Sequence, residues 1–419
     1  MSAPGSGTQT VTIARLGAQG HGIAHGEDGP IYVPFALPGE TVSIARVGAH
    51  GTVMSTATAS PDRVAPVCRH FGPDSDACGG CSLQHLADVP YQAFKRQLVV
   101  DALKSKGLTP EVRDLVTAAP GERRRVVFSA RMTEKGLLLG FNRGESHQLF
   151  SVVECPITTA GIVGRLDVIR RAAGALAQGT DVFRLTVLET RTGLDLSAEG
   201  LKALTDAQRR RATETVLALK GVVRLSVNGE ILIEKEKPLL DFASVPVSPP
   251  PGGFTQATRQ AEDAMAAIVI GHLGKAKRVA DLFAGSGTFA LRIAAKARVH
   301  AVESDAKAIA ALDHAARHAQ GLKPVSIERR DLYRRPMMAQ ELKVFDAVVF
   351  DPPRAGAEVQ MSELVRSGVK KVVAVSCNPL TLSRDLAILI AGGYRITSVT
   401  PVDQFLWNPH VEAVALLEK

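Results

Sequence analysis

The sequence predicts a multidomain chain, in which a small antiparallel β-barrel precedes a mixed α+β domain and an α/β domain built on a doubly wound parallel sheet. Its 419 residues are enough for two or three domains of ordinary size. Short alternating apolar runs fill residues 10–60, whereas apolar runs alternate with helical patterns after residue 254. Between them lies VPVSPPPGG, at 245–253, whose prolines lack the N–H that a helix or central strand needs. We therefore expect domains at 1–60, 61–245 and 246–419.

The composition favours a nucleic-acid partner and excludes a membrane span. Lys and Arg outnumber Asp and Glu by 50 to 42, giving a net charge of +8 and a pI near 9.3. No apolar run is long enough to cross a bilayer, and no signal-peptide pattern is present. Five cysteines, an odd number in so long a chain, argue against a secreted disulfide scaffold. We expect a soluble, cytoplasmic protein that acts as a monomer.

The N-terminal region predicts an OB-like barrel. The runs TVTIARLG, IYVPFAL and TVSIARVG are broken by Gly and Pro clusters at the spacing typical of a small antiparallel barrel. Its charges do not indicate an electrostatic clamp on RNA, because acidic residues outnumber basic ones. The basic residues are Arg15 and Arg46, and the acidic residues are Glu27, Asp28 and Glu40.

The central region predicts an α+β domain. Helix-like segments lie near 91–106 and 163–178, and FRLTVLET and VVRLSVNGEILI read as strands. Basic triplets at 123–125 and 209–211 are candidates for contact with nucleic acid. A solvated helix face explains the second triplet equally well.

The C-terminal region predicts a Rossmann-like domain with a cofactor loop. The strands VADLFA, VHAVES, DAVVFD and KVVAVSC alternate with helices, and a final pair of strands follows. DLFAGSGTFAL, at 281–291, puts a glycine-rich turn between a strand and a helix, where backbone can approach a ligand closely. Glu303 ends the next strand, where a carboxylate can hold ribose hydroxyls. The G-x-G spacing alone leaves a dinucleotide and S-adenosylmethionine both open.

FDPPRAG, at 350–356, favours the second cofactor. By itself this motif also fits a stiff strand-to-helix turn. Together with the glycine loop it resembles a class I methyltransferase. Families that methylate exocyclic amino groups carry an aromatic residue after the prolines, and here Arg354 stands in that place. This departure argues against amino methylation.

Four motifs in order, GGFTQ, DLFAGSG, DPPR and SCNP, followed by HVEAVALLE near the end, resemble the RNA (uracil-5-)-methyltransferase family over essentially the whole chain. The resemblance implies that Cys377 of SCNP is the nucleophile and that Glu412 of HVE is the proton acceptor. It also implies cofactor-binding residues in the C-terminal domain, namely Gln256, Phe283, Gly285, Gly287, Thr288, Glu303, Asp331 and Asp351. Thr288 replaces an Asn that is frequent in the family, but its hydroxyl can still form hydrogen bonds.

The chemistry explains why a thiol is needed. Uracil C5 cannot attack a sulfonium methyl directly, and addition of a thiolate at C6 turns C5 into an enolate carbon. After methyl transfer, a base removes the C5 proton so that the thiol can leave. The target base must leave its stack to meet Cys377, and Phe254 with Gln256 are candidates for holding it. A buried inert thiol and an exposed strand-edge carboxylate are the structural alternatives for Cys377 and Glu412.

The other four cysteines predict a metal centre. Cys68, Cys78, Cys81 and Cys155 are separated by nine, two and seventy-three residues. Four thiolates suit either a tetrahedral zinc or a cubane iron–sulfur cluster, and spacing does not separate the two. Family members with an N-terminal barrel, called a TRAM domain, carry a four-cysteine [4Fe-4S] cluster, and CGGCSLQHL resembles its ligand segment. The first gap is longer than usual for the family, which keeps zinc as the alternative.

The sequence therefore predicts S-adenosylmethionine-dependent formation of 5-methyluridine in structured RNA. The barrel and the cysteine set favour ribosomal RNA over transfer RNA. Three alternatives remain: 5-methyluridine formation in transfer RNA, methylation of RNA cytosine at C5, and a non-catalytic RNA-binding protein. Cytosine enzymes usually place their cysteine in a P-C sequence, whereas this thiol precedes Asn378 and Pro379.

Overall fold

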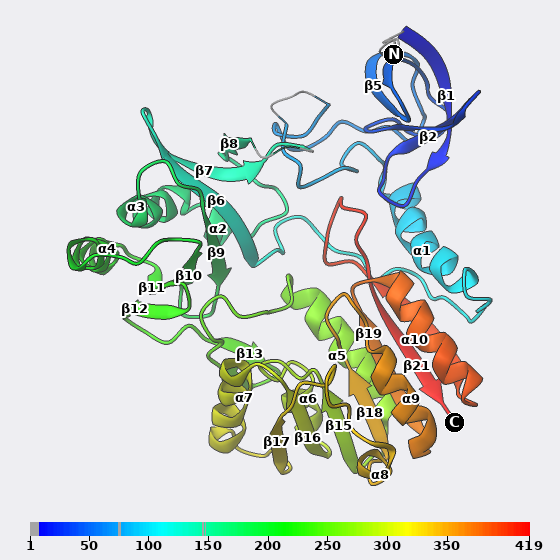
Figure 1. Cartoon of the computed structure of the whole chain (residues 1–419), viewed down its shortest axis with the longest axis vertical. Helices are drawn as coiled ribbons and strands as arrows, with labels where there is room; N and C mark the ends of the chain where they lie inside the picture. Colours follow the sequence, from blue (N-terminus) through cyan, green and yellow to red (C-terminus); the bar gives the residue numbers. More distant parts are fainter. Residues whose placement is uncertain (1–7, 74–76, 145, 147) are drawn as a thin grey trace.

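The computed structural model describes residues 8–73, 77–144, 146 and 148–419. Three parts follow one another along the chain: a barrel, a central sheet, and a C-terminal sheet with helices on both faces (Figure 1). No helix in these described ranges is long and apolar enough to cross a membrane.

The N-terminal barrel is closed, as predicted, with the strand order β1-β2-β3-β5-β4. In β1, Val11 and Ile13 are buried while their neighbours are exposed, because alternate residues of a strand face opposite sides. The strands are β1 (Thr8–Leu16), β2 (Gly22–Gly26), β3 (Gly29–Val33), β4 (Thr41–Val47) and β5 (His50–Thr58).

The barrel's surface is less acidic than its composition suggests. Glu40 is fully buried, and its two carboxylate oxygens accept hydrogen bonds from the Arg63 guanidinium at 2.6 and 2.8 Å.

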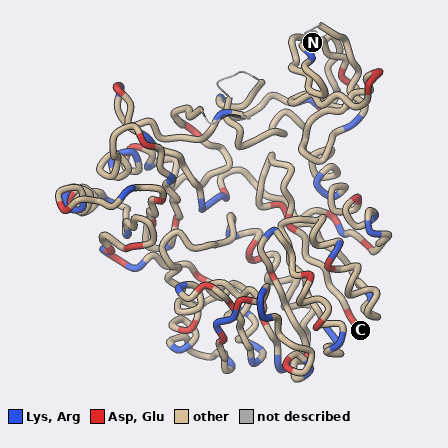
Figure 2. The backbone as a smooth tube through the Cα atoms, in the orientation of Figure 1, with Lys and Arg blue, Asp and Glu red and all other residues tan. Residues whose placement is uncertain are grey.

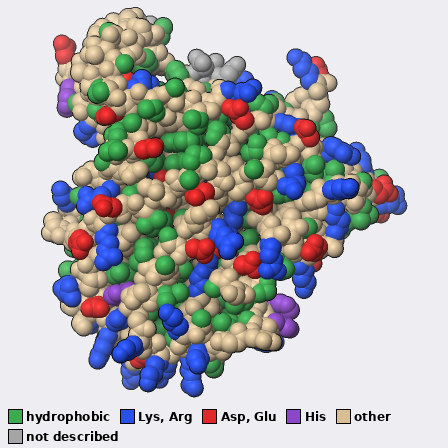
Figure 3. Space-filling model, turned by 180° about the vertical axis from the view of Figure 1, so that it is seen from behind, with side chains coloured by type: hydrophobic (Ala, Val, Ile, Leu, Met, Phe, Trp, Pro, Cys, Tyr) green, Lys and Arg blue, Asp and Glu red, His purple; other side chains and the backbone are tan. Residues whose placement is uncertain are grey.

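Lys and Arg are sparse on the barrel and numerous on the other two parts (Figure 2), and the view from behind gives the same impression (Figure 3). The positive net charge is therefore carried by the central and C-terminal regions.

The central region contains a seven-stranded sheet in the order β12-β11-β10-β9-β6-β7-β8. Strands β10 and β11 are parallel, and the other neighbouring pairs are antiparallel. Ile169 and Leu176 of α3 and Val216 of α4 pack into the apolar core of this sheet. The elements are α1 (Asp88–Lys104), β6 (Arg125–Thr133), β7 (Gly136–Asn142), β8 (Leu149–Ser151), α2 (Ala160–Val163), α3 (Leu166–Leu176), β9 (Phe183–Glu189), β10 (Leu194–Glu199), α4 (Asp206–Ala218), β11 (Val222–Val227) and β12 (Glu230–Glu234).

The C-terminal sheet has the order β17-β16-β15-β18-β19-β21-β20. Its first five strands are parallel, as predicted, but β21 runs antiparallel to both β19 and β20. The parallel prediction is wrong for β21 alone, because the loop that joins β20 to β21 at one edge reverses the chain, whereas β20 runs in the same direction as the first five strands. The elements are α5 (Arg259–Leu273), β15 (Arg278–Leu282), α6 (Ala290–Ala294), β16 (Arg298–Glu303), α7 (Ala306–His318), β17 (Val325–Arg329), α8 (Ala339–Leu342), β18 (Ala347–Phe350), α9 (Glu358–Ser367), β19 (Lys371–Ser376), α10 (Pro379–Ala391), β20 (Arg395–Val402) and β21 (Glu412–Glu418).

Two segments from earlier in the chain complete this C-terminal domain. Helices α5, α6 and α7 cover one face of the sheet, together with the small hairpin β13 (Leu240–Phe242) and β14 (Val245–Val247). Helices α9 and α10 cover the other face, and Val99 and Leu103 of α1 pack into the same apolar core. Helix α1 is therefore part of the sheet's second helical layer, although it precedes the central sheet in sequence.

Candidate active site

A cavity of about 620 Å³ opens at the carboxyl ends of β15, β16, β18 and β19. Ligands of open α/β sheets bind at this edge, because the loops after parallel strands meet there. Seven of the eight residues predicted to bind the cofactor line the cavity: Gln256, Phe283, Gly285, Thr288, Glu303, Asp331 and Asp351. Cys377 and Glu412 line it as well. The structure thus brings the cofactor residues and the two predicted catalytic residues together.

The glycine turn after β15 has the backbone geometry that its sequence requires. Gly285 and Gly287 have φ values of 55° and 101°, in the left-handed region that favours glycine. Gly287 does not line the cavity; a Cβ there would lie 2.5 Å from Leu312 Cδ1, so this glycine lets the turn pack on α7. The Gly285 N–H donates to Glu303 Oε2 at 2.9 Å. Glu303 therefore fixes the turn from the neighbouring strand.

Phe283 and Tyr333 form an aromatic wall of the cavity. Phe283 also has a positive φ, of 61°, and its ring centroid lies 5.6 Å from that of Tyr333. Such a wall suits a flat apolar group such as a purine ring. The set of a glycine turn, a carboxylate on the next strand and aromatic faces fits S-adenosylmethionine.

A chain of two amides joins the two carboxyl groups at the reactive end of the cavity. Gln256 Nε2 donates to Asp351 Oδ2 at 3.1 Å. Gln404 Nε2 donates to Gln256 Oε1 at 2.8 Å and to Glu412 Oε1 at 2.6 Å. Burial raises the pKa of Asp351 to about 7, and burial together with the nearby Asp351 carboxylate raises the pKa of Glu412 to about 8. Both groups therefore exchange protons near neutral pH.

Cys377 follows directly after β19 and is half-buried at the cavity wall. Burial, followed by the carboxylates of Glu412 and Asp351, raises the pKa of its thiol to about 11, while the Arg354 guanidinium acts in the opposite direction. The next residue, Asn378, caps α10, since its side chain accepts a hydrogen bond from the Leu380 N–H at 3.1 Å. The strand end and the helix cap together fix the backbone on both sides of the thiol.

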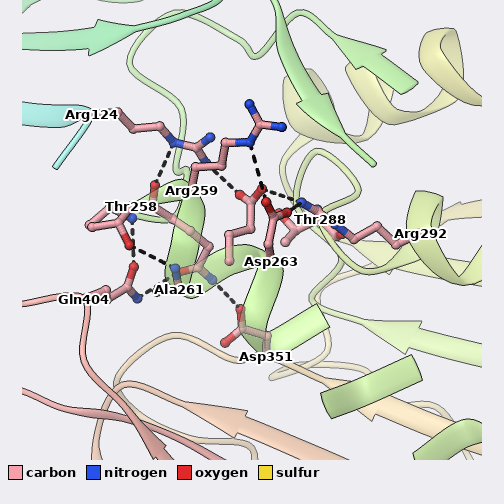
Figure 4. Close-up of polar contacts among 12 residues, drawn as sticks. Arg124, Thr258, Arg259, Ala261, Asp263, Thr288, Arg292, Asp351 and Gln404 are labelled. Atoms are coloured by element: carbon pink, nitrogen blue, oxygen red, sulfur yellow. Dashed lines mark hydrogen bonds and ion pairs between the residues drawn. The ribbon is translucent and has the colours of Figure 1, made fainter. Parts of the chain in front are cut away.

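The first basic triplet divides between the cavity and the domain core. Arg123 and Arg125 line the cavity, whereas Arg124 points away from it and pairs with Glu262 at 2.7 Å. Glu262 also pairs with Arg292 at 2.8 Å, so that the central sheet, α5 and α6 meet in one buried ionic cluster (Figure 4). The second triplet, at 209–211, lies on α4, away from the cavity.

Several residues of the site were not predicted from the sequence. Tyr333, Gln404 and His410 line the cavity without any prediction, and Arg123 and Arg125 line it although they were predicted only as contacts to nucleic acid. The alternation of side chains at the start of a strand could have separated Arg123 and Arg125 from Arg124. Nothing in the local sequence marks Gln404, because its partners are remote along the chain. Phe254, the candidate for holding the base, lines the cavity and is 72% exposed.

The remaining four cysteines line a second, small cavity of about 20 Å³ beside the central sheet. All five cysteines are free thiols, and Cys78 and Cys81 have pKa values raised by burial to about 11 and about 12. Within the described ranges, no group of three or more His, Cys, Asp or Glu side chains is placed to hold a metal ion. The donor set of four thiols around one space is nevertheless the set that a cubane cluster or a zinc ion takes.

Comparison with known proteins identifies the chain. The sequence model of the tRNA (uracil-5-)-methyltransferase family matches residues 248–419. An uncharacterized RNA methyltransferase of Agrobacterium fabrum is 68% identical over 98% of this chain and all of its own length. The 23S rRNA (uracil(1939)-C(5))-methyltransferase RlmD of Hahella chejuensis is 31% identical over 98% of this chain and 97% of its own. The chain belongs to the RNA (uracil-5-)-methyltransferase family.

A solved structure has the same fold. The tRNA (uracil-54, C5)-methyltransferase of Pyrococcus abyssi, in complex with S-adenosyl-L-homocysteine, aligns with a TM-score of 0.76, over 97% of this chain and 99% of its own, at 23% identity. This match confirms the predicted combination of an N-terminal β-barrel and a Rossmann-like domain in one chain. This RNA (uracil-5-)-methyltransferase transfers a methyl group from S-adenosylmethionine to uracil C5 in RNA.

The cofactor is expected to bind more tightly as the pH rises from about 6 to about 9. Because burial raises the pKa values of Asp351 and Glu412 above their ordinary range, this coupled pair of carboxyl groups loses its protons as the pH rises through the neutral range. A cation that enters the same cavity is attracted to the ionised forms, so binding of the sulfonium should release protons. Isothermal titration calorimetry in two buffers of different ionisation enthalpy measures that release. S-adenosylhomocysteine, which lacks the sulfonium charge, is the control, and an equal pH dependence for both ligands would contradict the prediction.

Proposed function

We propose that this enzyme forms 5-methyluridine in ribosomal RNA, with Cys377 as the nucleophile and Glu412 as the base. The observation that carries the proposal is the meeting of these two side chains, from the ends of adjacent strands β19 and β21, in the cavity that also holds the glycine turn. Glu412 is 4% exposed and has one carboxylate oxygen without a hydrogen-bond partner. An ordinary strand-edge carboxylate would be exposed to solvent.

In the proposed mechanism, the Cys377 thiol first loses its proton to solvent, Sγ then adds as the thiolate to uracil C6, and the electron pair of the C5–C6 double bond moves toward O4. The bound S-adenosylmethionine supplies the methyl group that C5 then takes. Glu412 removes the C5 proton; the electrons of the C5–H bond form the C5–C6 double bond, and the C6–S bond breaks with its electrons on Sγ. Cys377 is thereby returned as a thiolate, and the proton remains on Glu412 until it passes to solvent.

We further propose roles for the cofactor residues. Glu303 would accept hydrogen bonds from the ribose hydroxyls, the turn at Gly285 and Thr288 would hold the methionine part, and Phe283 and Asp331 would hold the adenine. Gln256 and Asp351 lie at the reactive end of the cavity, and Gly287 acts indirectly through the packing of the turn on α7.

For the four cysteines we propose a [4Fe-4S] cluster, with zinc as the alternative. Support comes from the four free thiols around one space, formed by chain segments as far apart as Cys68 and Cys155. Cys155 Sγ accepts a hydrogen bond from the Thr158 hydroxyl at 3.2 Å, and Cys78 Sγ accepts one from the Gly80 N–H at 3.3 Å. Such hydrogen bonds to sulfur are typical of the protein environment of a cluster. Anaerobic purification followed by analysis of iron, sulfide and zinc content distinguishes the cluster from zinc.

The choice of ribosomal RNA is supported by the relative from Hahella chejuensis, whose name gives 23S rRNA as its substrate.

We also propose the domain division 1–60, 61–245 and 246–419, with α1 and the hairpin β13–β14 packing against the third domain. RNA would lie mainly across the second and third domains, where the positive charges gather (Figure 2). Five free cysteines also suit the reducing cytoplasm, and we propose that the enzyme acts there as a monomer.

The deciding experiment is mass spectrometry of 5-methyluridine in separated ribosomal and transfer RNA from cells that lack the gene. We expect loss from ribosomal RNA, restored by the wild type but not by Cys377→Ala. Loss from transfer RNA alone would refute the ribosomal substrate and keep the chemistry. Unchanged 5-methyluridine with a loss of 5-methylcytidine would refute the uracil assignment.

A further inference from the structure

Gln404 is a buried side chain at the active site to which the mechanism above gives no role. It lies in the loop that joins β20 to β21, is 2% exposed, and lines the same cavity as Glu412. Its amide makes three hydrogen bonds: two join it to the consecutive residues Gln256 and Ala257, and the third joins it to Glu412. Figure 4 shows it entering the site beside Thr258, with Asp351 on the far side of the amide chain.

The orientation of this amide is fixed by chemistry. Gln404 Oε1 accepts a hydrogen bond from the backbone N–H of Ala257 at 2.8 Å. A backbone N–H can only donate, so the atom facing it must be the oxygen, and the opposite atom must be the NH₂ group. That NH₂ group has two protons, and it has two acceptors within reach, Gln256 Oε1 and Glu412 Oε1. The amide is thus fully satisfied in one orientation.

The consequence for Glu412 is that its two oxygens differ. Oε1 accepts the Gln404 hydrogen bond at 2.6 Å, whereas Oε2 is buried and has no hydrogen-bond partner. A donor to a carboxylate favours the ionised form, which is the form that can take a proton. A buried oxygen without a hydrogen-bond partner costs free energy. Oε2 is therefore the oxygen that gains more from accepting a proton.

We propose that Gln404 is a positioning residue for proton abstraction: its amide holds Oε1 of Glu412, favours the ionised carboxylate, and leaves Oε2 to take the C5 proton. The proposal rests on the proposed function, in which Glu412 is the base. In this step the C5–H bond breaks, its electrons form the C5–C6 double bond, and the C6–S bond breaks with its electrons on Cys377 Sγ. Gln404 itself exchanges no proton.

The other charged groups around Glu412 act in both directions. Asp351, after β18, opposes ionisation of Glu412, whereas Arg354 and Lys95 of α1 favour it. The Glu412 carboxylate in turn raises the pKa of the Cys377 thiol, which lies directly after β19. Among these groups and Gln404, only Gln404 forms a direct hydrogen bond to the Glu412 carboxylate within the described part of the chain. Removing it should therefore move the pH dependence of the step that Glu412 performs.

The test is a single-turnover reaction with RNA, in which the covalent protein–RNA adduct is quantified on denaturing gels at several pH values. Gln404→Met keeps the length of the side chain and removes the donor and the acceptor. We expect the adduct to form at a rate close to that of the wild type and to decay about tenfold more slowly near neutral pH. The pH profile of decay should shift to higher pH. Unchanged decay with an unshifted profile would overturn the proposal, as would equal slowing of formation and decay.

A matched control is Gln360→Met. Gln360 is 1% exposed and loses two hydrogen bonds, both to Met337, in a part of α9 that does not line the cavity. The covalent adduct of Gln360→Met should decay at the wild-type rate. Slower decay of the adduct in this variant would overturn the proposal. If Gln404→Met does not fold, Gln404→Asn keeps an amide shortened by one methylene; slower decay with the same direction of pH shift supports the proposal, and wild-type decay refutes it.

Glu412→Gln separates the two hypotheses. If it accumulates the methylated adduct while Gln404→Met behaves like the wild type, Glu412 is the base and the role of Gln404 is refuted. If Glu412→Gln resolves the adduct normally, the base assignment itself fails, and with it the premise for Gln404.

Discussion

Replacement of Cys377 by alanine is expected to abolish methylation, with a loss on the order of 10⁴-fold or more in single-turnover rate. The thiol is the atom proposed to form the bond to uracil C6, and within the described residues that line the cavity there is no second cysteine to replace it. Without that bond C5 stays a poor nucleophile, so neither the cofactor pocket nor Glu412 can compensate. Transfer of tritium from labelled S-adenosylmethionine to RNA measures the loss.

Two controls make this result specific. Cys377 is only half-buried, so its loss should disturb the packing little. Cys377→Ala should bind S-adenosylhomocysteine with the wild-type affinity and have the wild-type free energy of unfolding. Ser383→Ala makes a comparable small change at a buried side chain on the following helix, α10, and should retain full activity. A Cys377→Ala enzyme that still forms a covalent adduct with RNA would show that another group attacks C6.

From the sequence, each motif of the candidate site is expected at the end of a strand, and the roles of these residues stay predictions. The glycine turn, Glu303, Asp351 and Cys377 follow four strands that are parallel in the sheet, and parallel strands end at one edge. Their meeting in one cavity therefore follows from the alternation of strands and helices alone. Glu412 begins the antiparallel strand β21 at that same edge, and its position follows from the family motif instead of from the periodicity.

What the sequence does not predict depends on contacts between remote segments. The orientation of the Gln404 amide depends on its hydrogen bonds with Ala257 and Gln256, which lie almost 150 positions earlier. No local sequence pattern marks such a pairing. Helix α1 reads as part of the central region because it precedes the central sheet, and its packing on α10 and β20 appears only in three dimensions. Lys95, in the middle of this helix, shows the same limit most clearly: as a lysine it is expected at the surface.

Lys95 is in fact fully buried, and its ammonium group holds the loop that carries Gln404. Nζ donates to Asp403 Oδ1 at 3.0 Å, to the Phe405 carbonyl at 3.2 Å and to the His410 carbonyl. Asp403 is fully buried as well, and its Oδ2 accepts a hydrogen bond from the Tyr91 hydroxyl at 2.6 Å. Helix α1 and the loop between β20 and β21 are therefore joined by one buried ion pair in which every donor of Lys95 is used.

Lys95→Met is expected to lower the free energy of unfolding by about 3–5 kcal/mol, because it leaves the Asp403 carboxylate buried with its charge uncompensated. Urea denaturation measures the change. Lys104→Met is the matched control: this lysine lies at the exposed end of the same helix and should change the free energy by less than about 0.5 kcal/mol. The double variant Lys95→Met with Asp403→Leu removes both charges and should regain part of the loss, since two apolar side chains can replace a buried pair. If the double variant is no more stable than Lys95→Met, the cost lies in packing and the ion pair is not its cause.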